Sequence, residues 1–420
     1  MIHRIRLQRF KNFRDATLDL GPLTMIVGTN ASGKSNLRDA FRFLHGMARD
    51  YSLADIVGDK YVDGSIQWKG IRGGSREIAS FGQASFALTT SVPWEKKSST
   101  AAPGNYVHEL RVAVLKGSRP LRVMRESLHR NVTPVYHSHP LGEEPIQTEP
   151  ENILVRLGHQ SKEVQTLRFM SDQPVISQFE SHDEVPEELR GYAKHALNQM
   201  RSMRFLDPVP EMMKQPSFPG QPLGDRGENL SSVLQAICEE PMRKLALTEW
   251  IRELTPMDVI DLEFVPEQTG KILVNLVESN GQKTSAYSAS DGTLCFLAIV
   301  AALMGQDAAQ LYFLEEIDAG IHPTRLSLLL QLIEQHTRQE KVQVVATTHS
   351  PQVLAMLSLE SRENAVLVYR LENEAEAHIQ RIMDIPSVRD VLNHQNLARL
   401  HETGWLENVM AFSQPEGAEA

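Results

Sequence analysis

An eight-residue segment near the amino terminus has the composition and spacing of a phosphate-binding loop. Gly28-Thr29-Asn30-Ala31-Ser32-Gly33-Lys34-Ser35 fits the pattern G-x-x-x-x-G-K-S/T. Glycines let successive backbone N–H groups converge on phosphate oxygens, and the amino end of the following helix adds positive partial charge. Lys34 is expected to reach the β- and γ-phosphates, and the Ser35 hydroxyl to bind Mg²⁺. The pattern therefore predicts a site for ATP with Mg²⁺.

The segments on either side of this loop are those that a phosphate loop requires. Leu23–Val27 is short, apolar and β-favouring, and it ends directly before Gly28. After the loop, apolar residues recur at the spacing of one helix face, at Leu37, Ala40, Phe41, Leu44 and Ala48. The order of strand, glycine-containing loop and helix favours a nucleotide site over a chance glycine-rich turn.

A second chemical candidate is the acidic pair Glu315-Glu316, which follows the apolar strand predicted at Leu311–Leu314. In P-loop proteins a strand end of this kind holds a magnesium-side acid and a water-polarising base, so we expect Glu315 to orient Mg²⁺ and Glu316 to activate water. The first acid is usually Asp, and the extra methylene of Glu moves the carboxylate by about 1.5 Å. An acidic pair favoured by a helix dipole is the alternative.

Two polar segments near this strand have both a structural and a chemical interpretation. Ser290-Asp291-Gly292-Thr293 precedes a predicted helix, so Ser290 or Asp291 could simply be its N-cap. His349 follows the strand predicted at Val342–Thr347, and a lone histidine at a strand end is more often structural than catalytic. Four motifs follow one another along the chain: the phosphate loop, SDGT (290–293), EE (315–316) and THSP (348–351). This order favours the chemical interpretation of both segments.

This order resembles the ABC-type ATPase heads of the SMC, RecF and OLD group, and more closely the RecF-like ATPases that lack a TOPRIM domain. The resemblance covers about the first 50 residues and 285–351, with weaker similarity at 223–231 and in the last 40 residues. It implies that Ser290, Asp291, Gly292 and Thr293 form a signature motif that contacts the γ-phosphate bound to the other subunit. Asp318 matches the loop that communicates across the dimer, and His349 the switch histidine.

The same resemblance identifies residues on the nucleotide side of the fold. The opening segment 5–13 looks like the family's first strand and nucleotide-side loop, which makes Asn12 a nucleotide-binding candidate. Asn36, next to Ser35 in the phosphate loop, is a candidate by the same likeness. The Q-loop glutamine is not identified, with Gln67 and Gln83 as candidates.

Alternating strands and helices from about residue 293 to 351 predict a parallel sheet covered by helices. The expected fold is α/β: an ABC-type P-loop NTPase head, with a mixed sheet, a parallel core and flanking helices, that carries an inserted α+β lobe. We expect the head to comprise residues 1–95 and 255–420, and the lobe 96–254. Within the lobe, strands are expected at Val107–Leu115 and Leu121–Met124, and helices at Glu187–Met203 and Leu230–Leu254.

Composition excludes several other classes of protein. With 420 residues, 41% hydrophobic and 23% charged, the chain is an ordinary globular protein of two or three domains. Cys238 and Cys295 lie too far apart to indicate a disulfide framework or zinc ribbon. The longest apolar run, Cys295 to Met304, is about half of a membrane span, and the charged amino terminus has no signal-peptide pattern. A cytoplasmic location without membrane contact is expected.

The charge balance restricts nucleic-acid binding to a local surface. Lys and Arg total 43 against 53 Asp and Glu, a formal charge of −10. The densest basic run could track phosphates or be a solvated face, the more frequent case, and it comprises Arg111, Lys116, Arg119, Arg122, Arg125 and Arg130. A metal site at His129, His137 and His139 lacks supporting ligand spacing.

The resemblance implies ATP hydrolysis by a homodimer, or a higher oligomer, whose heads associate when ATP binds. About 250 residues without heptads separate Ser35 from Ser290, which is too few for an SMC coiled coil. No Asp-x-Asp pair occurs in the chain, so nuclease activity is not expected. The expected setting is DNA repair or anti-phage defence, with DNA bound through the lobe or a separate nuclease-like effector. The alternative is a nucleotide-gated sensor or scaffold that controls an effector without binding DNA.

Overall fold

The computed structural model describes residues 1–62, 65–94, 104–115, 121–138, 151–158, 165–254, 257–305, 309–339, 342–371 and 374–385. The chain folds as two compact units, each built from segments that are distant in sequence. The first unit comprises Met1–Gly21, Gly28–Met203 and Val366–Arg381. The second comprises Pro22–Val27, Arg204–Ala365 and, among the described residues, 382–385.

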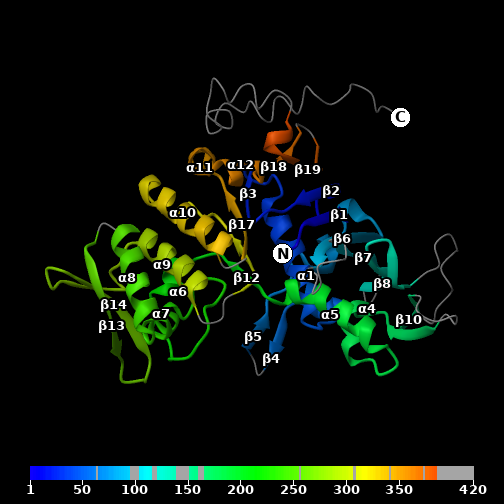
Figure 1. Ribbon diagram of the computed structural model, residues 1–420, viewed down its shortest axis with the longest axis horizontal. Coiled ribbons are helices and arrows are strands. Elements are labelled where there is room, and N and C mark those ends of the chain that lie inside the picture. The colour runs from blue at the N-terminus through cyan, green and yellow to red at the C-terminus, as the bar shows by residue number, and fades with distance from the viewer. Residues whose placement is uncertain are drawn as a thin grey trace. The chain divides into compact units, whose positions relative to one another are not determined.

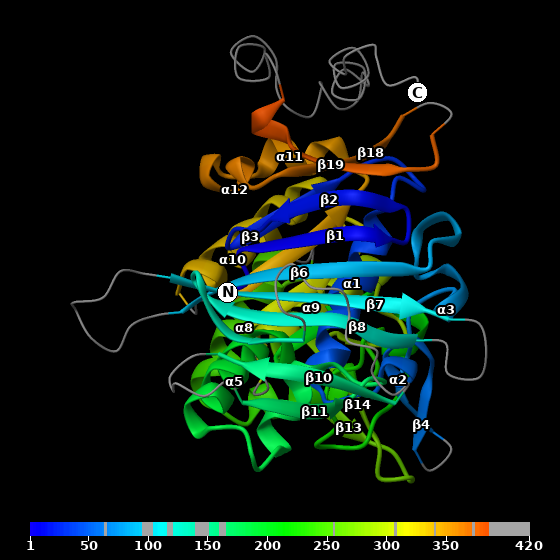
Figure 2. The ribbon, with the colours of Figure 1, turned by 90° about the vertical axis from the view of Figure 1, so that its right-hand side faces the viewer.

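The first unit is built on an eight-stranded antiparallel sheet. Its strands follow the order β11-β10-β9-β8-β7-β6-β1-β2, and Figure 2 shows this sheet face-on. In β1 the even-numbered Arg4 and Arg6 are exposed while Ile5 and Leu7 are buried, the alternation of a sheet with one covered face. The strands are β1 (Arg4–Phe10), β2 (Phe13–Asp19), β6 (Ser85–Trp94), β7 (Gly104–Val114), β8 (Leu121–Arg130), β9 (Thr133–His137), β10 (Asn152–Leu157) and β11 (Thr166–Met170).

Helix α1 forms the core of the first unit together with this sheet. Phe86 of β6 meets Phe10 of β1 and Phe43 of α1 edge-on, with both centroid distances 5.6 Å. Helix α5 packs against α1. The other elements of this unit are α1 (Lys34–Ala48), α2 (Leu53–Val57), α3 (Gly74–Glu77), α4 (Val175–Gln178), α5 (Glu187–Arg201), the 3₁₀ turns Ser80–Gly82 and Phe179–Ser181, and strands β4 (Lys60–Val62), β5 (Ser65–Trp68), β18 (Val366–Arg370) and β19 (Ala377–Arg381).

The second unit contains the predicted parallel strands. Strands β16 (Leu311–Leu314), β17 (Gln343–Thr348) and β3 (Leu23–Val27) pair in parallel, with Leu314 opposite Ala346 and Ala346 opposite Met25. Strand β12 (Met203–Leu206) is the neighbour of β16 in this sheet. It begins at Met203, the last residue of the first unit's second segment. Every residue of β16, β17 and β3 is buried, as expected for strands covered on both faces. Parallel pairing brings the carboxyl ends of these strands to one edge.

Helices pack against a small three-stranded antiparallel sheet, β13-β14-β15, in the rest of the second unit. Figure 1 shows α7, α8 and α9 gathered with β13 and β14, and α7 packs against α8, α9 and β14. These elements are α6 (Pro210–Met213), α7 (Leu230–Cys238), α8 (Pro241–Leu254), α9 (Asp291–Met304), α10 (Pro323–Gln339), α11 (Pro351–Met356), α12 (Leu359–Glu363), the 3₁₀ turn Ile382–Asp384, and strands β13 (Val259–Pro266), β14 (Ile272–Glu278) and β15 (Lys283–Ser285).

The parallel strands and the α/β class were predicted correctly, but one helix was not. The helix expected over Leu230–Leu254 is two helices, α7 and α8, separated at Glu239 and Glu240. Pro241 lacks a backbone N–H and begins α8 at the position where that loss costs nothing. The helix expected to continue to Met203 ends at Arg201, and Met203 begins β12.

The segment assigned to an inserted lobe contributes to both units. Residues 104–203 add β7–β11 to the sheet of β1, β2 and β6, and residues 204–254 belong to the second unit. The division into a head of residues 1–95 and 255–420 and a lobe of residues 96–254 stays a prediction.

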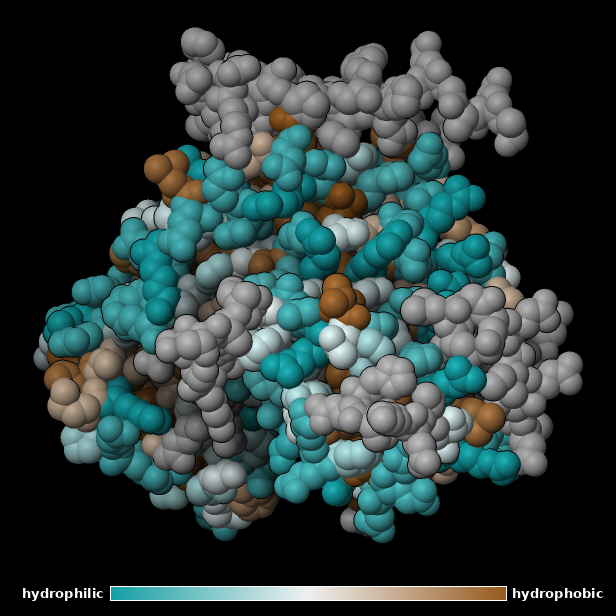
Figure 3. All heavy atoms as spheres, turned by 45° about the vertical axis from the view of Figure 1, so that its right-hand side comes forward, coloured by the Kyte–Doolittle hydropathy of each residue, from teal (hydrophilic) through white to brown (hydrophobic). Residues whose placement is uncertain are grey.

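No helix in the described ranges has the length and apolar composition needed to cross a bilayer. On the face shown in Figure 3, hydrophobic side chains occur in small groups among hydrophilic ones. Residues 386–420 lie outside the described residues.

Candidate nucleotide site

The phosphate-loop sequence adopts a tight loop between β3 and α1. The Lys34 ammonium donates hydrogen bonds to the carbonyl oxygens of Gly28 (2.7 Å) and Thr29 (2.9 Å), so it lies across the loop. Gly33 is the N-cap of α1 with φ 122°, a backbone conformation that side chains rarely permit. A Cβ on Gly28 would lie 2.1 Å from the Val368 carbonyl oxygen of β18. Glycine is therefore required at both ends of the loop.

Asn12 and Asn36 both lie against this loop. The Asn36 amide donates to the Asn12 side-chain oxygen at 2.7 Å, and the Asn12 carbonyl accepts from Ala377 N at 2.8 Å. The Asn12 amide also borders Gly33, about 3.0 Å from where a Cβ would stand. The turn between β1 and β2 thus adjoins the start of α1, where the family resemblance expects the nucleotide.

Arg72 contacts the start of α1. Its guanidinium donates to the Ser35 carbonyl and pairs with Asp39, at 3.1 Å from the carboxylate. The Lys11 ammonium lies 3.5 Å from the same buried carboxylate, and burial lowers the pKa of Lys11. Two cations therefore face the Asp39 carboxylate beside the phosphate loop. The only sequence signal was a basic residue before two glycines.

A cavity borders the outer turn of the loop. It has a volume of about 400 Å³ and is lined by Thr29–Ser32 and by residues of the β18–β19 connection, Arg370, Leu371, Glu374 and Ala375. The Ser32 hydroxyl is buried and has no hydrogen-bond partner among the described residues. A buried hydroxyl of this kind is suited to a polar ligand at the loop.

The acidic pair lies at the carboxyl end of β16, in the second unit. Glu315 N donates to the Leu206 carbonyl at 2.9 Å, which ties the end of β16 to β12. Glu316 has φ 45°, in the left-handed region, and its N–H donates to the Thr347 hydroxyl at 3.1 Å. A non-glycine residue there costs about 1–3 kcal/mol and is concentrated at functional sites. The Glu316 carboxylate, 60% exposed, lies 3.5 Å from the His349 ring. Of the three side chains predicted to be catalytic, Glu316, His349 and Lys34, the first two are thus neighbours.

Asp318 and the signature motif approach the same strand ends. The Thr348 hydroxyl donates to Asp318 at 2.6 Å and accepts from Ser350 N at 2.9 Å. A Cβ on Gly292 would lie 2.1 Å from the Gly320 carbonyl oxygen, so glycine lets the start of α9 contact the Asp318 loop. The second unit therefore brings the signature, Asp318, Glu316 and His349 together.

Ser290 is the N-cap of α9, as its structural interpretation predicts. Its hydroxyl accepts from Thr293 N at 3.2 Å and contacts the Thr293 hydroxyl at 2.8 Å. Ser290 is exposed, and the Asp291 side chain is 65% exposed. Lys214, which follows α6, pairs with Asp291 at 3.2 Å. This ion pair places a cation beside the signature and was not predicted from the sequence.

The remaining candidates are dispersed. The phosphate loop belongs to the first unit and Glu315–His349 to the second, and β3 joins them through the Val27–Gly28 bond. Gln67 in β5 and Gln83 after the turn Ser80–Gly82 are both exposed. His129 and His137 lie on β8 and β9, while His139 lies outside the described residues.

The basic run is only partly available for phosphate contacts. The Arg130 guanidinium stacks over the Trp94 ring at 4.2 Å and donates to the Tyr192 hydroxyl at 3.1 Å, so it takes part in packing. Arg111 and Arg125 are register partners on β7 and β8. Arg122 lies on β8, whereas Lys116 and Arg119 lie outside the described residues.

Comparisons with known proteins identify a matching family model and a similar protein. Residues 23–96 and 167–355, more than half of the chain, match the family model described as "AAA domain, putative AbiEii toxin, Type IV TA system". The chain is 22% identical over 368 residues to an "ATP/GTP phosphatase" of Helicobacter pylori (strain ATCC 700392 / 26695), covering 86% of this chain and 89% of that protein.

Solved SMC heads are similar at low identity. The SMC head bound to the C-winged helix domain of ScpA has a TM-score of 0.49 and 14% identity, covering 90% of this chain and 96% of that one. The SMC head domain from Thermotoga maritima has a TM-score of 0.41 and 12% identity, covering 91% and 98%.

Proposed function

Because the chain belongs to the family of AAA domains described with AbiEii, and is thus an ATPase of the P-loop class, we propose that two copies hydrolyse ATP at sites they share. Each site would combine the phosphate loop of one copy with the signature motif of the other. The observation that carries the proposal is the exposed signature at the start of α9, in contact with the loop that leads from Glu316. An exposed N-cap can meet a phosphate held by a second copy.

The phosphate loop supplies the binding half of the proposed site. The Lys34 ammonium can exchange its bonds to the loop carbonyls for phosphate oxygens, and the buried Ser32 hydroxyl lacks a described partner. The glycines, the amino end of α1 and the nearby cations Arg72 and Lys11 suit a triphosphate. Ser35 and Glu315 would hold Mg²⁺, which when bound would offset the charge of the β- and γ-phosphates.

Glu316 and His349 supply the hydrolytic half. The exposed Glu316 carboxylate can accept a proton from the attacking water, and the His349 ring at 3.5 Å can orient that carboxylate. The left-handed backbone of Glu316 and its bond to Thr347 fix the direction of the side chain. In P-loop enzymes positioning and charge stabilisation provide most of the catalysis.

ATP would act as the link between the two copies. The exposed Ser290 hydroxyl and the amino end of α9 favour a γ-phosphate, and Lys214 offsets the charge of Asp291 beside it. Hydrolysis would remove the γ-phosphate that both copies contact. Because the dimer would bind ADP less tightly than ATP, hydrolysis would favour separation of the two copies.

The test is the substitution Glu316→Gln. It should retain ATP binding and lower turnover by about 10²–10⁴-fold, the usual contribution of a general base. The variant should accumulate as an ATP-bound dimer, measured by light scattering after size exclusion with ATP and with ADP.

Glu334→Gln, a substitution in α10 remote from the acidic pair, is the matched control and should behave as wild type. Wild-type turnover in Glu316→Gln would contradict the assignment of Glu316 as the general base. A Glu316→Gln protein that stays monomeric when saturated with ATP would contradict the proposal that two copies share each site.

For the downstream role we propose a part in anti-phage defence through a separate partner protein, with DNA binding as the second candidate. A family description that names a toxin of a toxin–antitoxin system favours a multi-component system. The DNA candidate rests on Arg111, Arg122 and Arg125, since Arg130 is engaged in packing.

Turnover measured with and without duplex DNA separates these candidates. Stimulation that falls with salt and is lost in Arg111→Gln/Arg125→Gln would favour DNA. Co-purification of a host protein only with ATP, without DNA stimulation, would favour the partner.

A further inference from the structure

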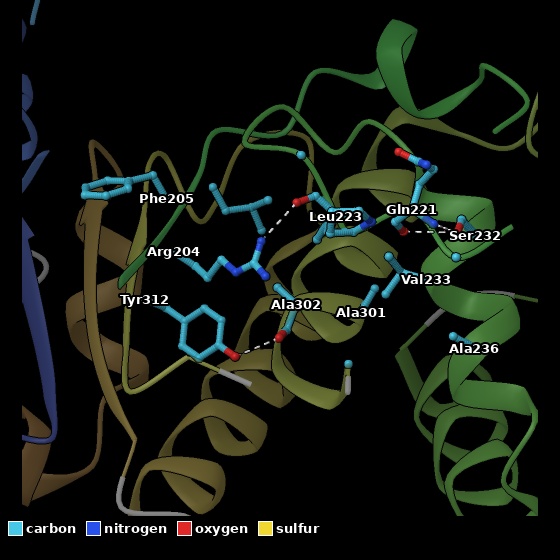
Figure 4. A pocket seen from close by; sticks show the side chains of 15 residues that line it. Arg204, Phe205, Gln221, Leu223, Ser232, Val233, Ala236, Ala301, Ala302 and Tyr312 are labelled. Carbon is cyan, nitrogen blue, oxygen red and sulfur yellow. Dashed lines mark hydrogen bonds between the residues drawn. The ribbon is translucent and has the colours of Figure 1, made fainter. Parts of the chain in front are cut away.

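The connection between β12 and α7, residues 207–229, is hydrogen-bonded to both of these elements, as Figure 4 shows. The Ser232 hydroxyl of α7 accepts a hydrogen bond from Gln221 N at 2.9 Å and donates to the Gln221 carbonyl at 3.0 Å. The Arg204 guanidinium of β12 donates to the Leu223 carbonyl at 3.4 Å. The later half of the connection is therefore held between the two elements.

The same connection folds back on itself around α6. Asp207 N donates to the Asp225 carbonyl at 2.8 Å, and Val209 N donates to the Arg226 carbonyl at 2.9 Å. These two bonds join the residues directly before α6 to the held half of the connection. Helix α6, which begins one residue after Val209, therefore starts from a fixed position.

Gly227 allows the connection to pack against both α6 and α9. It has φ 84°, in the left-handed region that favours glycine. A Cβ on Gly227 would lie 2.5 Å from Met213 Cγ and 3.7 Å from the Ala298 Cβ of α9. Met213, the last residue of α6, is fully buried, and α6 packs against α9. The next residue, Lys214, is therefore held beside α9.

Lys214 pairs with the first residue of α9. Its ammonium lies 3.2 Å from the Asp291 carboxylate and 2.8 Å from the Glu211 carboxylate. The Lys214 side chain is 20% exposed, whereas the side chains of Asp291 and Glu211 are 65% and 78% exposed. The lysine is thus the most enclosed member of this group, and it can orient the Asp291 carboxylate.

The charge of Asp291 bears on what the proposed site would receive at the start of α9. The signature Ser290–Thr293 contains an acid and no basic residue. A γ-phosphate is also an anion, so an uncompensated carboxylate at the same helix end would repel it. ADP has no γ-phosphate, and this repulsion would therefore act on the ATP-bound state. Lys214 is the cation that the structure places on Asp291.

We propose that Lys214 is a positioning residue of the shared site: by pairing with Asp291, it allows the signature of one copy to accept the γ-phosphate held by the other. This inference rests on the proposed function and adds to it a residue outside the four motifs. Because α6 and the phosphate loop belong to different units, Lys214 should act on the association of two copies and not on ATP binding by one copy.

A double-mutant cycle in Glu316→Gln, which should retain ATP, tests the inference. Association at saturating ATP is measured by sedimentation, and ATP affinity by titration with a fluorescent analogue. Lys214→Met keeps the apolar stem and should weaken association at least about tenfold at unchanged ATP affinity. When Asp291→Asn is also present, Lys214→Met should weaken association less than about threefold, because no carboxylate is left to offset.

Lys244→Met is the matched control. It removes another ion pair of the same unit, 2.6 Å from Asp261, and should associate like its Glu316→Gln parent. Unweakened association in Lys214→Met, loss of its ATP affinity, or an equal loss of association with and without Asp291→Asn would overturn the role of Lys214. A parent that stays monomeric with ATP would instead overturn the proposed function on which this inference rests, so the two failures are distinguishable.

Discussion

The phosphate loop and the acidic strand end are built in opposite ways. In the loop, Lys34 bonds to carbonyls only five and six residues away, and eight consecutive residues contain most of the geometry. At the strand end, Glu316 bonds to Thr347 and Asp318 to Thr348, pairs about 30 residues apart in sequence, and Gly292 comes from a third segment. One site is local and the other is assembled by the sheet.

This difference indicates which substitutions should affect binding and which should affect turnover. A local loop that holds phosphate by its own backbone should lose nucleotide binding when any one of its residues is changed. An assembled site depends on packing between segments, so its parts can be weakened separately while nucleotide still binds.

Lys34→Ala should have the largest effect, because it removes the cation of the local site. Loss of charge-assisted bonds worth about 1.5–3 kcal/mol should weaken ATP binding about 10- to 100-fold. Turnover should fall by about 10²–10³-fold further, as when a transition-state donor is removed. Titration with a fluorescent ATP analogue and steady-state assays measure both, with Lys69→Ala as the control. Unchanged affinity in Lys34→Ala would show that the loop is not the binding half.

Gly28→Ala and Gly292→Ala form a matched pair that compares the two sites. In each, the new Cβ would stand 2.1 Å from a backbone oxygen, at a cost of about 1–3 kcal/mol of overpacking. Gly28→Ala should lose ATP binding at least tenfold, whereas Gly292→Ala should bind ATP normally and turn over at least tenfold more slowly.

Gly191→Ala is the control for this pair, since a Cβ there meets no atom within 4 Å. The same nucleotide titration and turnover assay apply to all three proteins. Equal losses of binding in Gly28→Ala and Gly292→Ala would contradict the separation of a binding half from a hydrolytic half.

Thr348→Val should have a smaller effect, because it removes only the hydroxyl that joins Asp318 and Ser350 N. We expect the free energy of unfolding to fall by about 1–2 kcal/mol and turnover to fall less than tenfold at unchanged ATP affinity. Urea denaturation and steady-state assays measure these. Thr337→Val, which removes one bond within α10, should lose stability without losing turnover. Identical turnover in the two variants would make the Thr348 bond merely structural.

The sequence predicted the local features well because their determinants are adjacent. The strand at Leu23–Val27, the loop and α1 follow from hydrophobic spacing and glycine positions. The parallel strands followed from their apolar runs. The N-cap role of Ser290 also required only its neighbours.

What the sequence did not indicate depends on contacts between distant segments. Arg72 donates to the Ser35 carbonyl, 37 residues away in sequence. Lys214, which follows α6, pairs with Asp291 at the start of α9. Glu316 has a left-handed backbone, against the preference of glutamate, and its N–H bonds to Thr347 of the neighbouring strand. Pro241 is a sequence signal for the break between α7 and α8. The helical pattern on both sides of it nevertheless favoured one continuous helix.

Mixing two inactive variants tests most directly whether two copies share each site. Lys34→Ala disables the phosphate loop of its own chain, and Ser290→Arg blocks the signature offered to the other. Random pairing of equal amounts should restore about a quarter of wild-type turnover, because half of the dimers then contain one intact site. A chain with both substitutions should restore nothing when mixed with either single variant. Turnover of the mixture no greater than that of the separate variants would contradict the shared site.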